Sequence, residues 1–203
     1  MLLNTLENIR NCTACSLRSG AKQVVLGIGS ISAEILILGE APGVTEDETG
    51  IPFSGKSGII LTQTMAEVGL DINNVFISNI VKCRPPQNRK PRKNEITACS
   101  GNTEDLINTI NPKLIVAVGK SAIEYFIPVD EQASNYFGNV IVSKTRINNT
   151  TYKHRHVYCI IHPAAGLHNP DPILIENIKK YIRRIPVALE KVKNQQAEKS
   201  SLF

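Results

Sequence analysis

Four short apolar runs dominate the pattern of hydrophobic and polar positions along this chain. They cover residues 34–38, 75–81, 113–119 and 157–161. Each run is nearly continuous rather than alternating, which is typical of strands buried on both faces of a sheet. Segments with helical periodicity lie between them, so the pattern predicts right-handed β-α-β crossovers and a central four-stranded parallel sheet in an α/β fold. A possible edge strand covers 139–143.

The helical segments have recognisable starts and stops. We expect helices at 2–10, from Lys56 to about 69, at 95–110 with Asn94 as N-cap, and at 120–126. A last helix starts at Asp171 or Pro172 and runs to 193, with an interruption at Pro186. The chain is long enough for one well-buried core, so we predict a single domain over 1–193. The polar tail 194–203 should fray.

A glycine-rich stretch follows the first apolar run, and we interpret the rest of the chain around it. Residues 39–58 contain five glycines as well as Pro42 and Pro52, a composition suited to a shaped loop that allows close backbone approach. Structureless loops longer than about 12–15 residues are usually functional or disordered. In parallel sheets, ligands bind beyond the carboxyl ends of the strands. The loops that start at residues 39, 79, 119 and 162 should therefore share one crevice.

Composition narrows the class of protein. The 203 residues are 42% hydrophobic and 20% charged, and no apolar run approaches the ~18 residues of a membrane span. The N-terminus has polar residues where a signal peptide has its apolar stretch. We therefore expect a cytoplasmic monomer with no membrane contact and no obligate protein partner. The formal net charge of +5 is compatible with a polyanionic partner without requiring one.

The cysteines indicate ligation rather than a disulfide framework. Their number is odd, and four of the five stand as Cys12-x2-Cys15 and Cys83-x15-Cys99. Thiolates at such spacing bind zinc or an iron–sulfur cluster, and the spacing alone leaves the metal open. Cys83 and Cys99 could instead be small buried side chains, but neither lies in an apolar stretch. Cys159 lies inside an apolar run, where a core residue is expected.

Taken together, several motifs resemble those of the family 4 uracil-DNA glycosylases. They are the Cys-x2-Cys pair, Gly39-Glu-Ala-Pro-Gly43 with Gly50-Ile-Pro-Phe-Ser-Gly55, Asn79-x2-Lys-Cys-Arg-Pro-Pro-x-Asn-Arg89, Cys99 and His162-Pro-Ala. The match runs in order from about Leu6 to Pro170. The resemblance implies a three-layer α/β/α sandwich and a [4Fe–4S] cluster on Cys12, Cys15, Cys83 and Cys99. It also implies hydrolysis of the N-glycosidic bond of deoxyuridine in DNA, which releases uracil and leaves an abasic site in base-excision repair.

The residues fit that chemistry when they are considered on their own. An enzyme that acts on a base extrudes it into a pocket and stacks it on an aromatic ring, which Phe53 can supply. The amide of Asn79 offers an acceptor for uracil N3–H and a donor for O4, whereas cytosine presents the reverse pattern. His162 can stabilise negative charge on uracil O2, and a neutral tautomer suffices as donor. The alternatives are a core phenylalanine, a turn asparagine and a structural histidine.

The general base is less well defined. Related glycosylase families carry Asp where this chain has Ala41. The adjacent Glu40 is therefore the candidate, to orient water or to contact the base, and Ala41 and Pro42 complete that wall of the pocket. Glu46 and Asp47 could equally be solvated charges. Alternatively, stabilisation of the leaving group dominates and no strong base is needed.

A basic loop follows the second apolar run. Six of the twelve residues 82–93 are Lys or Arg, and contacts to DNA phosphates are the expected use of such a group. The alternative is a solvated loop. The candidate phosphate contacts are Lys82, Arg84, Arg89, Lys90, Arg92 and Lys93.

Three other functions remain open at this point. The first is a non-catalytic iron–sulfur protein of the same fold that binds nucleic acid, because fold does not guarantee activity. The second is a zinc-structured domain that acts on another nucleotide. The third is a relative that stays covalently attached to the abasic site through a histidine.

Overall fold

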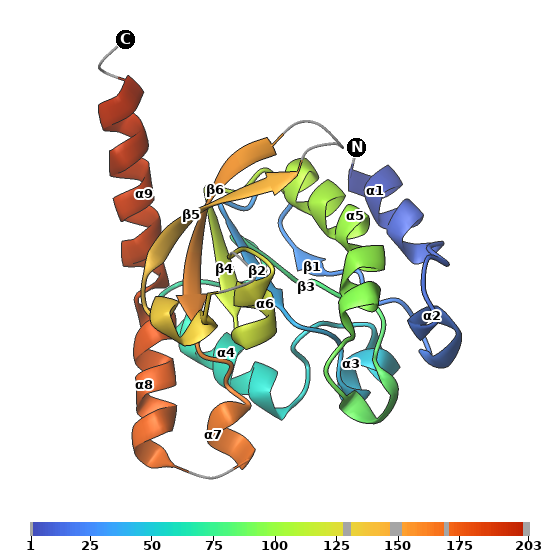
Figure 1. The fold of residues 1–203 in the computed structure, drawn as a ribbon. Coiled ribbons are helices and arrows are strands. Elements are labelled where there is room, and N and C mark those ends of the chain that lie inside the picture. Colours follow the sequence, from blue (N-terminus) through green and yellow to red (C-terminus); the bar gives the residue numbers. More distant parts are fainter. Residues whose placement is uncertain (1, 128–130, 147–151, 169–170, 201–203) are drawn as a thin grey trace.

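One six-stranded sheet forms the centre of the protein (Figure 1). The computed structural model describes residues 2–127, 131–146, 152–168 and 171–200. Along the sheet the strand order is β1-β3-β2-β4-β6-β5. The strands are β1 (Ile28–Gly29), β2 (Ile35–Gly39), β3 (Val75–Asn79), β4 (Leu114–Val118), β5 (Val140–Arg146) and β6 (Tyr152–Ile160).

The four predicted parallel strands are β3, β2, β4 and β6, and they are neighbours in that order. The α/β class is therefore confirmed, but the strand number of four was too low. The short strand β1 pairs antiparallel with β3, and β5 pairs antiparallel with β6. The prediction missed β1 because a strand of two residues, one of them Gly29, carries no periodicity. It placed β5 at an edge, where it lies.

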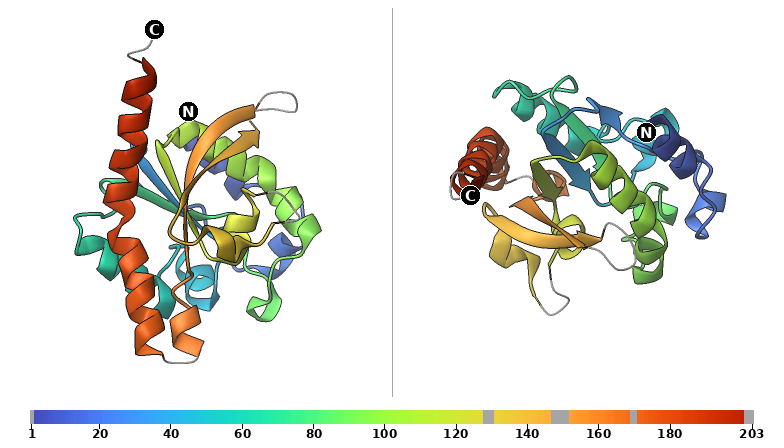
Figure 2. Two further views of the ribbon diagram at one scale, coloured as in Figure 1. Left: turned by 60° about the vertical axis from the view of Figure 1, so that its left-hand side comes forward. Right: turned by 90° about the horizontal axis from the view of Figure 1, so that it is seen from above.

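Helices cover both faces of the sheet, which gives three layers (Figure 2). The alternation of side chains along β2 separates two cores: Leu36 and Leu38 pack with α1 and α5, whereas Ile35 and Ile37 pack with α4, α8 and α9. The helices are α1 (Leu2–Arg10), α2 (Leu17–Gly20), α3 (Val44–Thr49), α4 (Lys56–Ala66), α5 (Lys93–Ile110), α6 (Lys120–Glu124), α7 (Ala165–His168), α8 (Pro172–Arg183) and α9 (Ile185–Ser200). Two 3₁₀ turns, η1 (Pro86–Asn88) and η2 (Ala133–Tyr136), lie in loops.

Some helix boundaries differ from the prediction. Helix α5 begins at Lys93 and not at Glu95, and its N-cap is Arg92 and not Asn94. The Glu95 carboxylate accepts a hydrogen bond from the backbone N–H of Arg92 at 2.7 Å. The expected interruption before Pro186 is present, since α8 ends at Arg183 and α9 begins at Ile185. Helix α9 continues to Ser200, beyond the predicted end at 193. Residues 201–203 lie outside the described residues.

The chain segments that follow β2, β3, β4 and β6 all leave the sheet at its carboxyl edge. The glycine-rich stretch after β2 is less irregular than expected, because it contains α3. Because ligands of parallel sheets bind beyond the carboxyl ends of the strands, this edge is where we expect the functional site.

Among the described residues, no helix is both long and apolar enough to cross a membrane.

Candidate functional site

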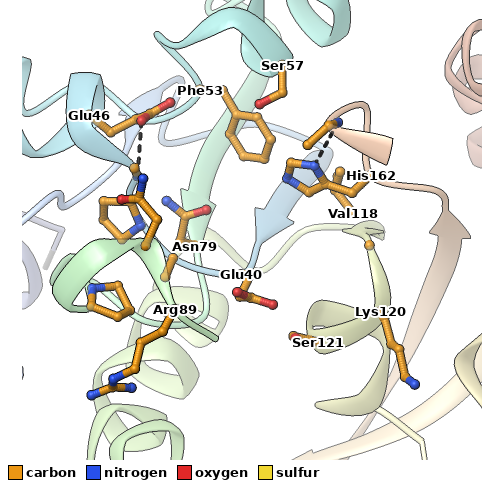
Figure 3. Close-up of a pocket in the computed structure, with 17 residues that line it drawn as sticks. Glu40, Glu46, Phe53, Ser57, Asn79, Arg89, Val118, Lys120, Ser121 and His162 are labelled. Atoms are coloured by element: carbon orange, nitrogen blue, oxygen red, sulfur yellow. Dashed lines mark hydrogen bonds between the residues drawn. The ribbon is translucent and has the colours of Figure 1, made fainter. Parts of the chain in front are cut away.

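A cavity of about 380 Å³ opens at the carboxyl edge of the sheet (Figure 3). All four parallel strands contribute to it, through their last residues or the loops that follow. It contains all six predicted base-pocket residues, which are Glu40, Ala41, Pro42, Phe53, Asn79 and His162. The other lining residues are Gly43, Glu46, Ser57, Pro85, Asn88, Arg89, Val118, Gly119, Lys120, Ser121 and Ala164.

Phe53 and His162 form an aromatic wall of the cavity. Their ring centroids are 6.0 Å apart and their planes differ by 24°. Phe53 has a positive φ of 54°, which is uncommon for a non-glycine residue. Gly58 allows this conformation, because a Cβ there would overlap the backbone of Phe53. The loop thus turns an aromatic ring towards the cavity at some conformational cost.

Asn79 ends β3 beside Gly39, its partner on β2. It is only 3% exposed, yet its side-chain amide makes no hydrogen bond to another described residue. A Cβ on Gly39 would overlap Oδ1 of Asn79 and would lie 2.6 Å from Cζ of Phe53. The glycine therefore makes room for both side chains. A buried amide that lines a cavity without a partner is suited to bind a polar ligand.

His162 follows β6, and its ring has a defined tautomer. The backbone N–H of Ala164 donates to Nδ1 at 3.1 Å, so Nδ1 is the acceptor and Nε2 carries the proton. Burial lowers the pKa of His162 to about 4, although the carboxylate of Glu46 opposes that shift. The imidazole is therefore neutral at pH 7. Gly119 allows the close approach of this ring, since a Cβ there would lie 2.7 Å from Cβ of His162.

Glu40 directly follows β2 and is half-buried. Figure 3 shows its carboxylate between Asn79 and Ser121. This carboxylate makes no hydrogen bond or ion pair with another described residue. It is thus available to a water molecule or a ligand in the cavity.

Glu46 and Asp47 are buried, so the alternative that they are solvated charges was wrong. The carboxylate of Glu46 accepts hydrogen bonds from the backbone N–H groups of Gly43 at 3.0 Å and Gly55 at 2.9 Å. It joins both ends of the segment that carries Phe53. Asp47 accepts from the backbone N–H of Lys22 at 3.0 Å. These two carboxylates hold the glycine-rich stretch in shape.

A second, smaller cavity brings together Cys12, Cys15, Cys83 and Cys99. Burial, and after it the charge of Cys99, raise the pKa of the Cys83 thiol to about 12. Among the described residues, no three His, Cys, Asp or Glu side chains are arranged as ligands of one metal ion. Cys159 is buried within β6, as expected of a core residue.

The basic loop forms part of the rim of the large cavity, where Pro85, Asn88 and Arg89 line it. Both Nη atoms of Arg89 donate to the carboxylate of Glu95, at 2.8 and 2.6 Å. The ammonium of Lys90 pairs with Glu124 at 3.0 Å. Two of the six predicted phosphate contacts are therefore already held by carboxylates.

The remaining four cations differ in exposure. Arg92 and Lys93 are exposed and make no side-chain hydrogen bond or ion pair with another described residue. Arg84 is half-buried and donates to Oδ1 of Asn88 at 2.7 Å, and its Nη1 lies 4.0 Å from Oδ2 of Asp47, at the limit of an ion pair. Lys82 is 1% exposed and its ammonium bonds inside the protein. The prediction that Lys82 contacts phosphate was therefore wrong, because its charge cannot reach the surface.

Comparison with known proteins decides the family. The model of the uracil DNA glycosylase superfamily matches residues 26–185. A type-4 uracil-DNA glycosylase of Sulfurisphaera tokodaii is 40% identical over 189 residues, which cover 89% of this chain and 83% of the relative. The chain belongs to that superfamily, in its type-4 family. The enzyme of the same name from Saccharolobus solfataricus is 38% identical, over 86% of this chain and 82% of the relative. The type-4 uracil-DNA glycosylase of Thermotoga maritima is 43% identical over 121 residues, which cover 60% of this chain and 63% of the relative.

The prediction from sequence named only part of the cavity lining. It missed Ser57, Lys120 and Ser121, and it did not assign Glu46 to the pocket. A signal for Lys120 and Ser121 was present, because the loop at Gly119 was expected in the crevice. Glu46 and Ser57 belong to the stretch 39–58, which was also expected in the crevice, but the positions of their side chains depend on how α3 and α4 fold after β2.

Proposed function

We propose that this protein is a uracil-DNA glycosylase that hydrolyses the N-glycosidic bond of deoxyuridine in DNA. One observation carries the proposal: an aromatic ring, an amide with no hydrogen-bond partner in the described part of the chain, and a neutral histidine converge on one cavity from three separate segments. They are Phe53, Asn79 and His162. Base excision requires a pocket of this kind, because the enzyme must hold and read an extruded base.

Recognition of uracil follows from the chemistry of Asn79. Its amide oxygen accepts from uracil N3–H, and its NH₂ donates to O4. Cytosine has an acceptor at N3 and a donor at C4, so the same amide would face two mismatched groups. Each mismatch leaves a buried polar group unsatisfied, and this is how a site of this kind rejects an analogue. Phe53 stacks on the face of the base.

Departure of the base leaves negative charge on uracil, and His162 is suited to stabilise it. Nε2 carries the proton because Nδ1 accepts from Ala164. A neutral donor in a partly buried site can bind the oxyanion at O2 without reorganisation during the reaction. Water must then add to C1′ of the sugar, and Glu40 is the group that can orient it. Ala41 and Pro42 line the same side of the cavity.

A uracil-release assay tests this function. The substrate is an oligonucleotide with one deoxyuridine, and the control is the same oligonucleotide with deoxycytidine. Release of free uracil with an alkali-sensitive strand supports the proposal. Binding without release would favour a non-catalytic nucleic-acid-binding protein. A protein–DNA band that survives a denaturing gel would instead favour covalent attachment through a histidine.

We also propose that Cys12, Cys15, Cys83 and Cys99 hold a [4Fe–4S] cluster. Four thiols around a single cavity match the donor set of such a cluster. Four thiolates also suit zinc, which the iron measurement below distinguishes from the cluster. When bound, the cluster would tie the N-terminal segment to the loop after β3 and to α5. Cys83 and Cys99 are buried in one hydrophobic core and Cys15 packs against it, which limits access of water on that side.

Iron quantification and visible absorption test the cofactor. We expect about four irons per chain and a broad visible band that bleaches with dithionite. Cys83→Ser should lose both, whereas Cys159→Ser should keep both because Cys159 lies away from the cavity. Stoichiometric zinc without iron in the protein as purified would contradict the proposal.

A further inference from the structure

Lys82 lies buried between the base pocket and the cysteine cavity. Its ammonium donates to Oγ of Ser78 at 3.0 Å and to the backbone carbonyl oxygen of Asn79. Its side chain also lines the cysteine cavity. An ammonium buried in this way is costly unless it is hydrogen-bonded, so these two acceptors account for its position. The partner that matters for function is Asn79, whose side chain lines the base pocket.

The peptide that joins Asn79 to Ile80 is held at both ends. Lys82 donates to its carbonyl oxygen, and its N–H donates to the carbonyl oxygen of Gly39 at 2.9 Å. Because a peptide unit is planar, two opposed hydrogen bonds fix its orientation. That orientation sets the direction of the Asn79 side chain, which is attached to the same unit. Gly39 also leaves space for Oδ1 of Asn79.

Further hydrogen bonds fix Lys82 itself. The Ser78 hydroxyl that accepts from Lys82 donates to the carbonyl oxygen of Leu26 at 2.8 Å. The backbone carbonyl of Lys82 accepts from the N–H of Val25 at 2.8 Å. The ammonium therefore belongs to a connected buried network, and such networks hold their members in one arrangement when every member is satisfied.

We propose that Lys82 is a positioning residue for uracil recognition, which acts by holding the carbonyl group of Asn79. This inference rests on the proposed function. Lys82 touches neither the base nor the DNA backbone, so it should affect how well the pocket holds uracil and not how strongly the protein binds phosphates. It thus differs in kind from the exposed cations of the same loop.

Lys82→Met tests the proposal, because Met keeps the apolar stem and removes the donor. We expect the inhibition constant of free uracil to rise about tenfold and kcat to fall by a similar factor, as expected for the loss of a hydrogen bond to a charged group. The KM for DNA at low salt should stay within twofold of the wild type, since it reports phosphate contacts. Iron per chain and thermal stability are measured on the same samples.

Thr103→Val is a matched control. The buried hydroxyl of Thr103 donates to the carbonyl oxygen of Ile80 at 2.9 Å, one residue beyond the carbonyl that Lys82 holds. Removal of the Thr103 hydroxyl breaks one buried hydrogen bond to a backbone carbonyl and leaves the hydrogen bonds of the Asn79 backbone intact. We expect it to lower the melting temperature and to leave uracil inhibition unchanged. An equal rise of the inhibition constant in both variants would mean general loosening and would overturn the proposal.

A folded Lys82→Met variant with wild-type uracil inhibition would also overturn it. If this variant does not fold, Lys82→Gln takes its place, since its shorter, neutral side chain weakens the hydrogen bond to the carbonyl of Asn79. The expected rise is then about threefold, and no rise would refute the inference. Failure of the proposed function can be told apart from failure of this inference, because in that case the wild-type protein itself releases no uracil. In that case calorimetric binding of free uracil to the same variants still tests Lys82.

Discussion

The backbone N–H of Ala164 donates a hydrogen bond to Nδ1 of His162 at 3.1 Å. This contact exists because the chain turns sharply at Pro163 after leaving β6. It determines that Nε2 is the donor which a ligand in the cavity meets. A protonated ring would lose this bond, since Nδ1 would then carry a proton opposite an N–H group.

Uracil release should therefore depend on pH through His162. Burial lowers its pKa to about 4, compared with an ordinary value of 6.5. We expect kcat/KM to stay level from pH 8 to about pH 5 and to fall as the pH approaches 4. A fall centred near 6.5 would contradict this assignment. His162→Gln should lower kcat by about a hundredfold and abolish that acid limb.

The same shift has a consequence for stability. Between pH 6.5 and 4 the unfolded chain binds a proton at His162 that the folded chain does not. The free energy of unfolding should therefore decrease as the pH falls through this window, and this contribution should be fully present above 6.5. Urea unfolding of the wild type and of His162→Gln at several pH values measures this contribution, because the variant lacks the imidazole that titrates.

Gly39→Ala should damage the pocket more than it damages the fold. The added Cβ would overlap Oδ1 of Asn79 and lie 2.6 Å from Cζ of Phe53. We expect a loss of about 1–3 kcal/mol in unfolding free energy from overpacking, and at least a tenfold loss in kcat/KM. Gly101→Ala is the control, since nothing lies within 4 Å of its new Cβ. Wild-type activity of Gly39→Ala would show that the pocket can relax.

Glu40→Gln and Glu46→Gln should fail in different ways. The Glu40 carboxylate has no partner among the described residues, so we expect unchanged stability and a kcat lower by about a hundredfold. Wild-type uracil release by Glu40→Gln would remove this residue from the mechanism. It would leave stabilisation of the departing base as the main source of catalysis.

In Glu46→Gln the two acceptor oxygens become one. The carboxylate accepts from Gly43 and Gly55, and the NH₂ of Gln would face one of these N–H groups. We expect the free energy of unfolding to fall by about 1–3 kcal/mol, with a weaker binding of uracil because Phe53 lies within the segment that Glu46 closes. If the denaturant midpoint and the melting temperature of Glu46→Gln equal those of the wild type, the two hydrogen bonds make no net contribution to the free energy of unfolding.

The exposed cations of the basic loop should act through salt-dependent binding. Lys93→Met removes an exposed charge that has no partner among the described residues. We expect a higher KM for DNA, an unchanged kcat, and a slope of log K against log salt that is shallower by about 0.9. Lys191→Met, an exposed change on α9, controls for net charge. A slope equal to that of the wild type would place Lys93 outside the DNA interface.

Several features followed from the sequence by itself. The apolar runs of β2, β3 and β4 are long, unbroken and flanked by turn residues, so local pattern alone indicated a buried parallel sheet. Parallel order then predicted a shared edge for Glu40, Asn79 and His162. The two-residue strand β1 and the helical end of α9 were missed, since neither has a distinctive pattern.

Other features depend on how the backbone turns after a strand or helix, which the pattern of apolar and polar residues does not encode. A lysine in a basic loop is expected at the surface, yet Lys82 is buried because two acceptors at the end of β3 lie within reach of its ammonium. Glu46 is buried because two backbone N–H groups nine residues or fewer away turn towards it. The sequence by itself thus determined which side chains are at the carboxyl edge. Only the tertiary structure decided their hydrogen-bond partners, and partners determine whether a charge is buried and which tautomer a histidine adopts.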